Sequence, residues 1–205
     1  HMLGNFRQML EAVARSTGML YMLDNYTSSV AGPNENFARE LFELHTMGAE
    51  NYLGVMRQDD VPVDPQGRPI GYVDADLCEA TRCFTGWSVA NGQSGAPNTG
   101  VFHYRSSWHD RFQKRVLRVF IPQDQPELVD GGMVLDALAA HPGTARFIAR
   151  KLCRRLIGDT PSQATVDAAA QVFYDQRAAS DQLRQVVRAI LLSAEFRATW
   201  GEKVK

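Results

Sequence analysis

The second half of the chain repeats one pattern, in which apolar residues recur at helical spacing between residues that start or stop helices. Four such segments follow Leu128: "GGMVLDALAAH", "PGTARFIARKLCRRLIG", "PSQATVDAAAQVFYDQR" and "SDQLRQVVRAILLSAEF". Pro142, Ser162 and Ser180 stand where helices would begin, and Gly158 where one would stop. Apolar side chains three and four residues apart predict helices that bury one face against each other.

The first half predicts shorter helices separated by loops. Leu3 to Arg15 and the following "MLYML" have helical spacing. The stretch "PNENFARELFELHTMG" predicts a helix with Asn34 as N-cap and Gly48 as its C-terminal stop. Residues 49–73 predict a long loop, and Asp74 caps a further helix through "ADLCEATRCF".

Residues 88–125 have a different character from the rest of the chain. "NGQSGAPNTG" is typical of a turn, whereas "VFHYRS" and "RVLRVFI" alternate in the manner of two short strands. We interpret this segment as a small β-hairpin-like insert, with a long ordered loop as the alternative. The predicted fold is an all-α, bundle-like single domain over residues 3–200 with this insert, preceded by an expression scar at residues 1–2.

Charge and composition narrow the classes of partner. The chain has 205 residues and a formal net charge of -1, which gives no overall attraction to nucleic acid. No apolar run approaches the roughly 20 residues of a membrane-spanning helix. The three cysteines leave at least one unpaired. Cys78 and Cys83 lie five positions apart on a predicted helix and point in different directions, so we expect small buried hydrophobes rather than a disulfide or zinc pair.

Several stretches together resemble a bacterial family, domain-of-unknown-function family 1800. They are "LGNFRQMLEAVARSTGMLYMLDN", "PNENFARELFELHTMG", "DLCEATRCFTGWSV", "FHYRSSWHD" followed by Lys114, and "HPGTARFIARKLCRRLIGD". The resemblance extends from Leu3 to about Phe196, and the chain looks like the C-terminal portion of the family domain. One departure is Cys83, where the family form "ARALTGW" has an apolar residue, so we expect no family-wide catalytic thiol there.

The resemblance implies a helical fold and export to the periplasm or cell surface, beside other envelope proteins. It implies no established activity, and it leaves the cofactor and any metal unknown. A partner protein or polymer of the envelope is therefore the expected ligand, whereas the mechanism must come from the residues themselves.

The predicted helix from Asn34 offers paired charges. Glu35, Arg39 and Glu43 stand at i, i+4 and i+8, a spacing that stabilises a helix surface by about 0.2–0.5 kcal/mol per pair. If this face lay under the 49–125 segment, Glu35 and Glu40 could instead serve acid–base chemistry or hold a divalent cation. His45 falls on the apolar face, where a packed core histidine is the simpler interpretation.

The segment "FHYRSSWHDRFQK" is the densest in reactive groups. His109 and Asp110 could supply a base or metal ligands if they met Glu35, Glu40 or His45. The simpler alternative is that they form a local turn and that Lys114 pairs with an acid. No HExxH, GxSxG, P-loop or dinucleotide fingerprint is present.

Candidate binding residues come from three places in the sequence. Arg150 and Arg154 lie on the basic face of "ARFIARKLCRR", which is either solvated or binds an anionic polymer or partner. Trp87 flanks the predicted insert, where an aromatic ring suits a sugar or peptide or forms part of a small core. The remaining candidates are the charged residues Arg39, Arg82 and Lys114.

Two functions from different classes follow from these features. The first is a non-catalytic exported module that binds a partner protein or polymer. The second is a metal-assisted or acid–base hydrolase built from Glu35, Glu40, His45, His109 and Asp110. Convergence of the 34–45 helix and the 103–114 segment on one cleft would favour the hydrolase.

Overall fold

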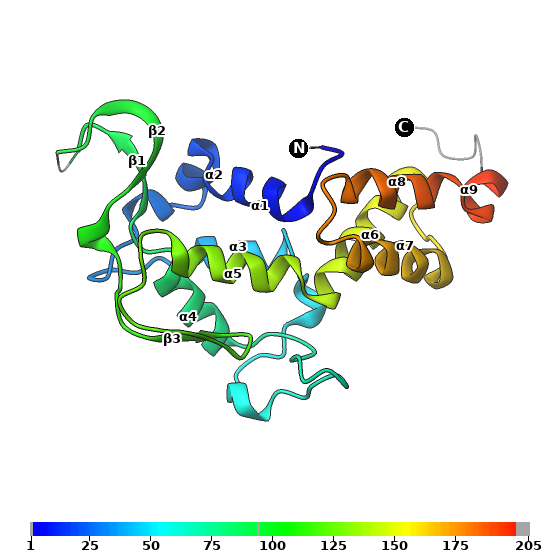
Figure 1. The fold of residues 1–205 in the computed structure, drawn as a ribbon, viewed down its shortest axis with the longest axis horizontal. Helices are drawn as coiled ribbons and strands as arrows, with labels where there is room; N and C mark the ends of the chain where they lie inside the picture. The colour runs from blue at the N-terminus through cyan, green and yellow to red at the C-terminus, as the bar shows by residue number, and fades with distance from the viewer. Residues whose placement is uncertain (1, 94, 200–205) are drawn as a thin grey trace.

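The computed structural model describes residues 2–93 and 95–199 and is predominantly helical (Figure 1). His1 of the predicted scar and Trp200 of the predicted domain lie outside the described residues. The helices of the first part are α1 (Phe6–Ala14), α2 (Thr17–Met22), α3 (Asn36–Glu43), α4 (Asp74–Cys83) and α5 (Val129–Ala139). Those of the second part are α6 (Pro142–Leu156), α7 (Gln163–Asp175), α8 (Gln182–Leu191) and α9 (Ala194–Ala198).

Side chains cap two of the helices whose starts the sequence predicts, α6 and α7. The Ser162 hydroxyl accepts from the backbone N–H of Thr165 at 3.3 Å and begins α7 as predicted. The imidazole of His141 has the same role at α6, where it accepts from Gly143 N–H at 3.0 Å and Pro142 occupies the first helical position.

Several helix predictions are wrong at their ends. The N-cap residue of α3 is Glu35 rather than Asn34, and that of α4 is Val73 rather than Asp74. The helix predicted up to Gly48 stops at Glu43, because the hydroxyl of Thr46 turns back and donates to the carbonyl of Leu41 at 2.7 Å. The last predicted helix begins after Asp181 rather than Ser180 and breaks near Ser193, whose side chain caps the separate helix α9.

The all-α prediction is corrected by two antiparallel hairpins. The first pairs β1 (Trp87–Asn91) with β2 (Asn98–Tyr104), and the second pairs β3 (Lys114–Val116) with β4 (Val119–Ile121). The predicted strands therefore belong to different hairpins, and "RVLRVFI" contains a turn of its own. That turn uses Leu117 (φ 50°) and Arg118 (φ 64°), a left-handed pair that matches strand twist.

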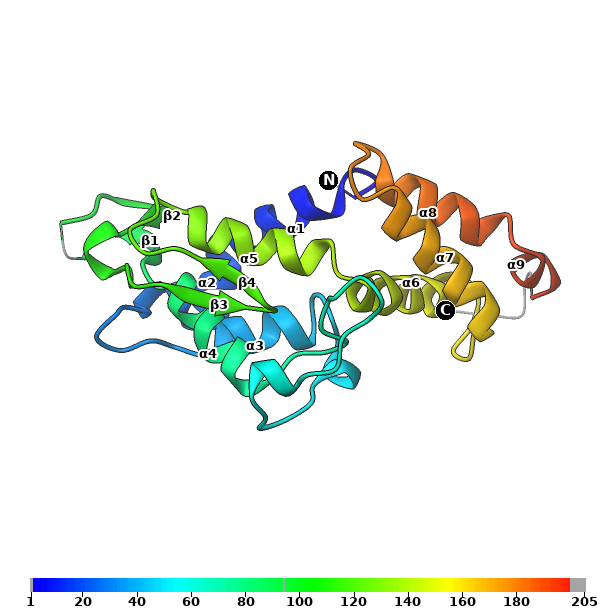
Figure 2. The same cartoon turned by 60° about the horizontal axis from the view of Figure 1, so that its bottom comes forward.

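The helices enclose one continuous apolar core that extends from Phe6 to Ile190. α6 packs against α7, and α7 against α8, to form the C-terminal layer at the right of Figure 1. α1 lies along α5, and the β3–β4 hairpin lies between α4 and α5 (Figure 2). Within the described ranges, no helix combines the length and apolar character that crossing a membrane requires.

α5 approaches β1 very closely at one position. A Cβ atom at Gly131 would lie 2.5 Å from Cζ2 of Trp87 and 3.1 Å from Cε1 of Phe84. The helix can therefore pack on these rings only because residue 131 has no side chain. This close approach also places the neighbouring Asp130 beneath the β3–β4 hairpin.

Candidate functional site

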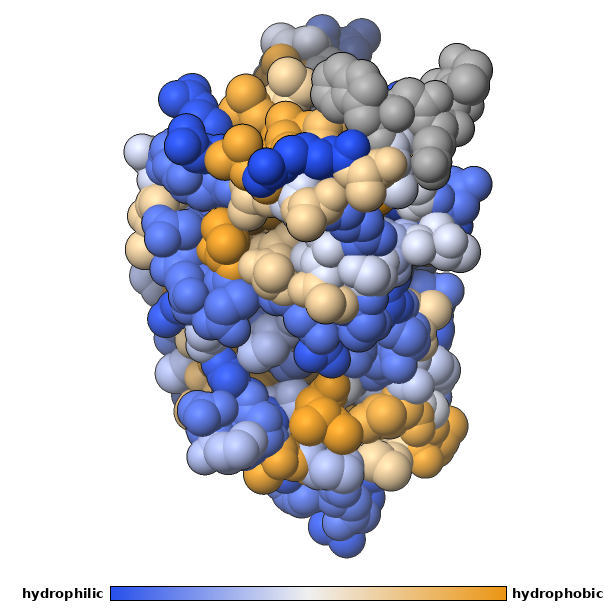
Figure 3. Space-filling view, turned by 90° about the vertical axis from the view of Figure 1, so that its right-hand side faces the viewer, coloured by the Kyte–Doolittle hydropathy of each residue, from blue (hydrophilic) through white to orange (hydrophobic). Residues whose placement is uncertain are grey.

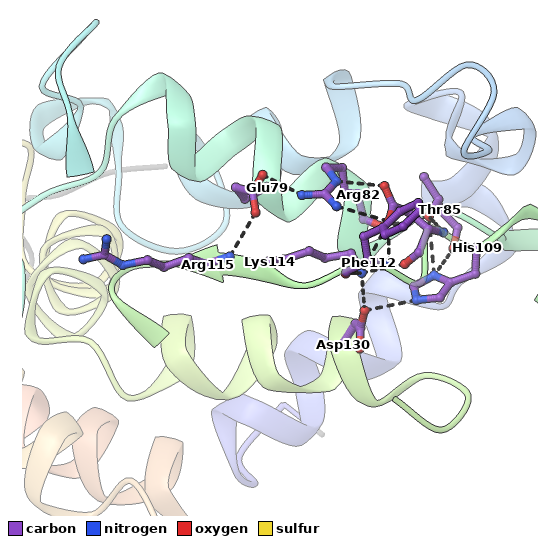
Figure 4. A network of polar contacts seen from close by, with 9 residues as sticks. Glu79, Arg82, Thr85, His109, Phe112, Lys114, Arg115 and Asp130 are labelled. Carbon is purple, nitrogen blue, oxygen red and sulfur yellow. Dashed lines mark hydrogen bonds and ion pairs between the residues drawn. The ribbon is translucent and has the colours of Figure 1, made fainter. Parts of the chain in front are cut away.

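Lys114 is the centre of a buried polar network (Figure 4). It lies on β3, and its side chain is fully buried. Its ammonium donates to Asp130 Oδ2 at 2.6 Å, to the carbonyl of Phe112 at 2.7 Å and to the carbonyl of Asp110 at 2.5 Å. Three acceptors match the three N–H groups of lysine, which offsets the cost of removing the charge from water.

Asp110 connects this network to α4. Its two carboxylate oxygens accept from Arg82 at 2.8 and 3.2 Å, a bidentate arrangement. Burial would raise the pKa of Asp110, but the hydrogen bonds from Arg82 and from the backbone of Phe112 outweigh it and hold that pKa below its ordinary value. Arg82 also binds Glu79 at 2.7 Å. Asp110 is therefore a charged structural partner at neutral pH.

His109 bridges the same network to the end of α4. Its Nδ1 lies 2.9 Å from the carbonyl of Thr85, and its Nε2 lies 3.1 Å from Asp130 Oδ2. Each ring nitrogen of His109 therefore faces an acceptor oxygen of a different element. Burial opposes ionisation of Asp130, but hydrogen bonds from His109 and Lys114 keep its pKa below the usual range.

The side chains of this network are buried and are not arranged around an open space. The side chains of His109, Asp130 and Lys114 are 7%, 3% and 0% exposed, respectively. A substrate would have to displace the hairpin to reach them. The geometry therefore suits a clamp that holds β3 and the preceding loop onto α4 and α5.

Glu35 and Arg39 form a second, separate cluster at the surface. Arg39 Nε donates to Glu35 Oε1 at 2.9 Å and its guanidinium lies 3.8 Å from Asp74, to which Tyr52 also donates. Asp74 begins α4, whereas Arg82 is near the end of that helix, so the contacts that anchor the two clusters are about 12 Å apart along the helix. The 34–45 helix and the 103–114 segment therefore do not share a cleft.

The other predicted catalytic residues lie apart from both clusters. His45 follows the end of α3 and is partly buried; burial and the nearby charge of Lys151 lower its pKa. Glu40 lies partly exposed on α3. Among the described residues, no three His, Cys, Asp or Glu side chains are grouped so that they could hold a metal ion.

Trp87 has no surface to offer a ligand. It is 1% exposed on β1, and its ring meets those of Phe84 and Phe102 at centroid distances of 5.1 and 5.4 Å. This packing matches the interpretation that Trp87 forms part of a small core, rather than the one in which it contacts a sugar or peptide.

Two cavities of about 280 and 490 Å³ lie at the start of α6, and Pro142 and Arg146 belong to the lining of both. We call the two together the α6 groove. The other residues that line the first cavity are Glu50, Asn51, Asp64, Pro69, Ile70, His141, Gly143 and Arg150. The other residues that line the second cavity are Gln66, Arg68, Ala145, Ala170, Gln171 and Tyr174.

Each guanidinium of the α6 groove has a carboxylate neighbour at the surface. Arg150 lies 2.9 Å from Glu50, Arg146 lies 3.4 Å from Asp167, and Arg68 lies 2.7 Å from Asp64. Tyr174 has Arg68 within cation–π distance, 5.2 Å from its ring centroid. The groove therefore combines apolar walls with guanidinium and carboxamide groups that could bind acids and hydroxyls.

The sequence prediction found only part of this groove. Arg150 was predicted, and it lines the groove; Arg154 is exposed farther along α6 and does not line either cavity. Arg146 belongs to the same basic face by its i, i+4 spacing. Asn51, Arg68 and Tyr174 were missed because they come from a loop and another helix, which no local pattern relates to α6.

The whole chain matches one known protein family. A family described as "Protein of unknown function (DUF1800)" matches residues 1–205. The chain belongs to this family. No curated protein and no solved structure matches it. Two of the family-like stretches of this DUF1800 chain supply the buried network, and a third supplies α6 and its groove.

Proposed function

We propose that this DUF1800 chain is an exported or envelope-associated module that binds a partner polymer, and that the polymer lies in the α6 groove. The observation that carries the proposal is that two cavities share Pro142 and Arg146 in their linings, which places them side by side along α6. Export is the expectation from the family resemblance.

The chemistry of the groove favours a polymer with acidic groups. Surface ion pairs contribute only about 0–1 kcal/mol each, so Arg68, Arg146 and Arg150 can exchange their own carboxylates for those of a ligand at little cost. Asn51, Gln66 and Gln171 provide carboxamides that can donate to and accept from hydroxyl groups. An acidic glycan presents both kinds of group along one chain.

The experiment is a calorimetric titration of the chain with a uronic-acid oligosaccharide and with a neutral oligosaccharide of the same length. Binding of the acidic oligomer, weakened by added salt and by Arg146→Ala, is expected. The Arg146 side chain is 60% exposed, so its removal should leave the fold intact. Arg57→Ala, which removes the same charge from an exposed residue that lines neither cavity, is the matched control. Affinity unchanged by Arg146→Ala, or no affinity at all, would refute this site.

Binding is preferred to hydrolysis because the predicted catalytic side chains lie in separate places, and His109 is buried with Asp130. Elemental analysis by mass spectrometry tests the metal-assisted alternative. We expect the purified chain to take up no near-stoichiometric zinc, manganese or calcium. Stoichiometric metal that is lost in both His109→Ala and Glu35→Ala would instead restore the hydrolase.

A further inference from the structure

Phe112 is an exposed aromatic residue on a rigid backbone. Its side chain is 69% exposed, immediately before β3. Its backbone N–H donates to Asp110 Oδ1 at 2.9 Å, and its carbonyl accepts from the buried ammonium of Lys114 at 2.7 Å. Figure 4 shows Phe112 beside the network that holds it. The buried charges thus fix the backbone of a residue whose ring the chain itself leaves uncovered.

A ring presented in this way is suited to act as an anchor. Exposed apolar residues that occur singly are common and need no function. An aromatic side chain on an ordered loop differs, because binding then costs little further conformational entropy. Aromatic anchors that fill a pocket dominate the energy of many protein interfaces.

A pocket of suitable character lies at the other end of the molecule. A cavity of about 350 Å³ is lined by the apolar side chains of Leu3, Val187, Leu191 and Leu192 and by the arginines Arg184 and Arg188. We call it the α8 pocket. Figure 3 faces this end of the molecule and shows apolar side chains gathered near its top, in the region of α8.

The position of the α8 pocket excludes an intramolecular contact. β3, which directly follows Phe112, and α8 lie toward opposite ends of the long axis in Figures 1 and 2. A Phe112 ring can therefore reach an α8 pocket only in another copy of the chain.

The charges around the two features are complementary. Among the described residues, the α8 pocket is lined by two arginines and by no carboxylate. Near Phe112, the exposed Asp124 donates its backbone N–H to the carbonyl of Arg111 at 2.8 Å, and the exposed Glu127 follows in the same loop. Among the exposed side chains the two acids outnumber Arg111, and the buried Asp110 and Asp130 are matched by Arg82 and Lys114. The Phe112 side is therefore net acidic where the α8 pocket is basic.

Arg184 and Arg188 could also contact the Phe112 ring directly. This chain already places guanidinium groups over aromatic rings, with Arg105 at 4.6 Å from the centroid of Trp108 and Arg15 at 4.5 Å from that of Phe102. Arg184 or Arg188 can make the same contact with an inserted phenyl ring.

We propose that Phe112 of one copy inserts into the α8 pocket of a second copy. The two surfaces differ, so the contact is heterologous: each copy keeps one free ring and one free pocket after pairing. Association is therefore head-to-tail and extends with concentration, rather than stopping at a two-fold dimer.

Sedimentation equilibrium over a wide concentration range tests this contact. The wild-type chain is expected to form dimers and higher species progressively. Phe112→Ala removes the anchor and Leu191→Asp places a charge in the α8 pocket; each is expected to weaken association by about thirtyfold or more. Phe120→Ala and Met22→Asp, at residues that are 57% and 67% exposed elsewhere, are matched controls that should associate like the wild type.

Mixing the two variants distinguishes this contact from any symmetric one. Phe112→Ala keeps an intact pocket and Leu191→Asp keeps an intact ring, so an equimolar mixture is expected to form a 1:1 dimer that cannot extend. Circular dichroism confirms that both variants are folded. A monomeric wild type at every concentration would overturn the proposal, as would association that survives Phe112→Ala or folded variants that do not pair.

Discussion

Lys114 Nζ lies 2.6 Å from Asp130 Oδ2 at a place where neither side chain reaches solvent. The residues are 16 positions apart and come from different elements, β3 and α5. An ion pair of this kind need not stabilise a protein relative to an apolar pair. Once present, however, each partner depends on the other, because either charge alone would be buried without compensation.

Replacement of Lys114 by methionine is expected to destabilise the chain by about 3–5 kcal/mol, since it leaves the Asp130 carboxylate and two carbonyls without their donor. Urea unfolding followed by circular dichroism measures the change. Arg115→Met is the control, because that side chain pairs with Asp59 at the surface. The double variant Lys114→Met/Asp130→Asn should recover part of the loss; a single variant as stable as the wild type would contradict this account.

Acid is expected to unfold the chain through Asp110 and Asp130. Both have a folded-state pKa below the ordinary value of 3.8. The unfolded chain therefore binds more protons in this range, so their contribution is fully present above about pH 5 and is lost as pH falls through 3.8 toward the lower folded values. Urea midpoints measured downward from pH 5 check this. Asp110→Asn should already be less stable at pH 7 and should show a shallower fall.

A separate loss of stability is expected at milder pH from His141. Burial lowers its pKa below the ordinary 6.5 and outweighs the hydrogen bond to the carbonyl of Pro69, which raises that pKa. Protons then bind preferentially to the unfolded chain, so stability falls as pH drops from 7 through 6.5. The urea midpoint should decrease between pH 7 and 5.5, and His141→Gln should flatten that decrease. An unchanged slope in His141→Gln would assign the effect to His45.

Alkylation should distinguish the three cysteines. Cys78 is exposed, whereas Cys83 and Cys153 are buried. Burial raises the pKa of Cys153 to about 11 and raises that of Cys83 further, so neither offers much thiolate at pH 8. Intact-mass measurement after iodoacetamide treatment should show one adduct in the native chain and three in denaturant. Cys78→Ser should abolish the native adduct.

The helices of this chain were largely predictable because their signals are local. Ser162 caps α7 at the residue where the sequence predicts it, and apolar spacing identifies the buried face. A β-hairpin-like insert was also predicted, but the second hairpin was not, because its turn at Leu117 and Arg118 uses left-handed backbone without glycine or asparagine. Nothing in "RVLRVFI" therefore distinguishes one strand from two.

The candidate site was predictable only within one segment. The density of charge in "FHYRSSWHDRFQK" identified His109, Asp110 and Lys114, which do lie together. Their main partner, Asp130, was missed, since an acid in the first turn of a helix looks like an ordinary N-terminal residue. A meeting of Glu35 with these residues was one of two alternatives, and the other, a surface ion pair with Arg39, matches the structure, in which the two clusters contact different ends of α4.

The close contact at Gly131 makes two adjacent glycines of α5 differ in the substitutions that they tolerate. A methyl group at 131 would act as a wedge between the helix and Trp87, and it would move the neighbouring Asp130 away from Lys114. At Gly132 the nearest atom to such a methyl group is the Arg7 guanidinium at 3.9 Å, so alanine fits there and gains about 0.8–1.0 kcal/mol of helix propensity. In a mutational scan, substitution of Gly131 would thus lower stability, whereas substitution of the adjacent Gly132 by alanine would raise it.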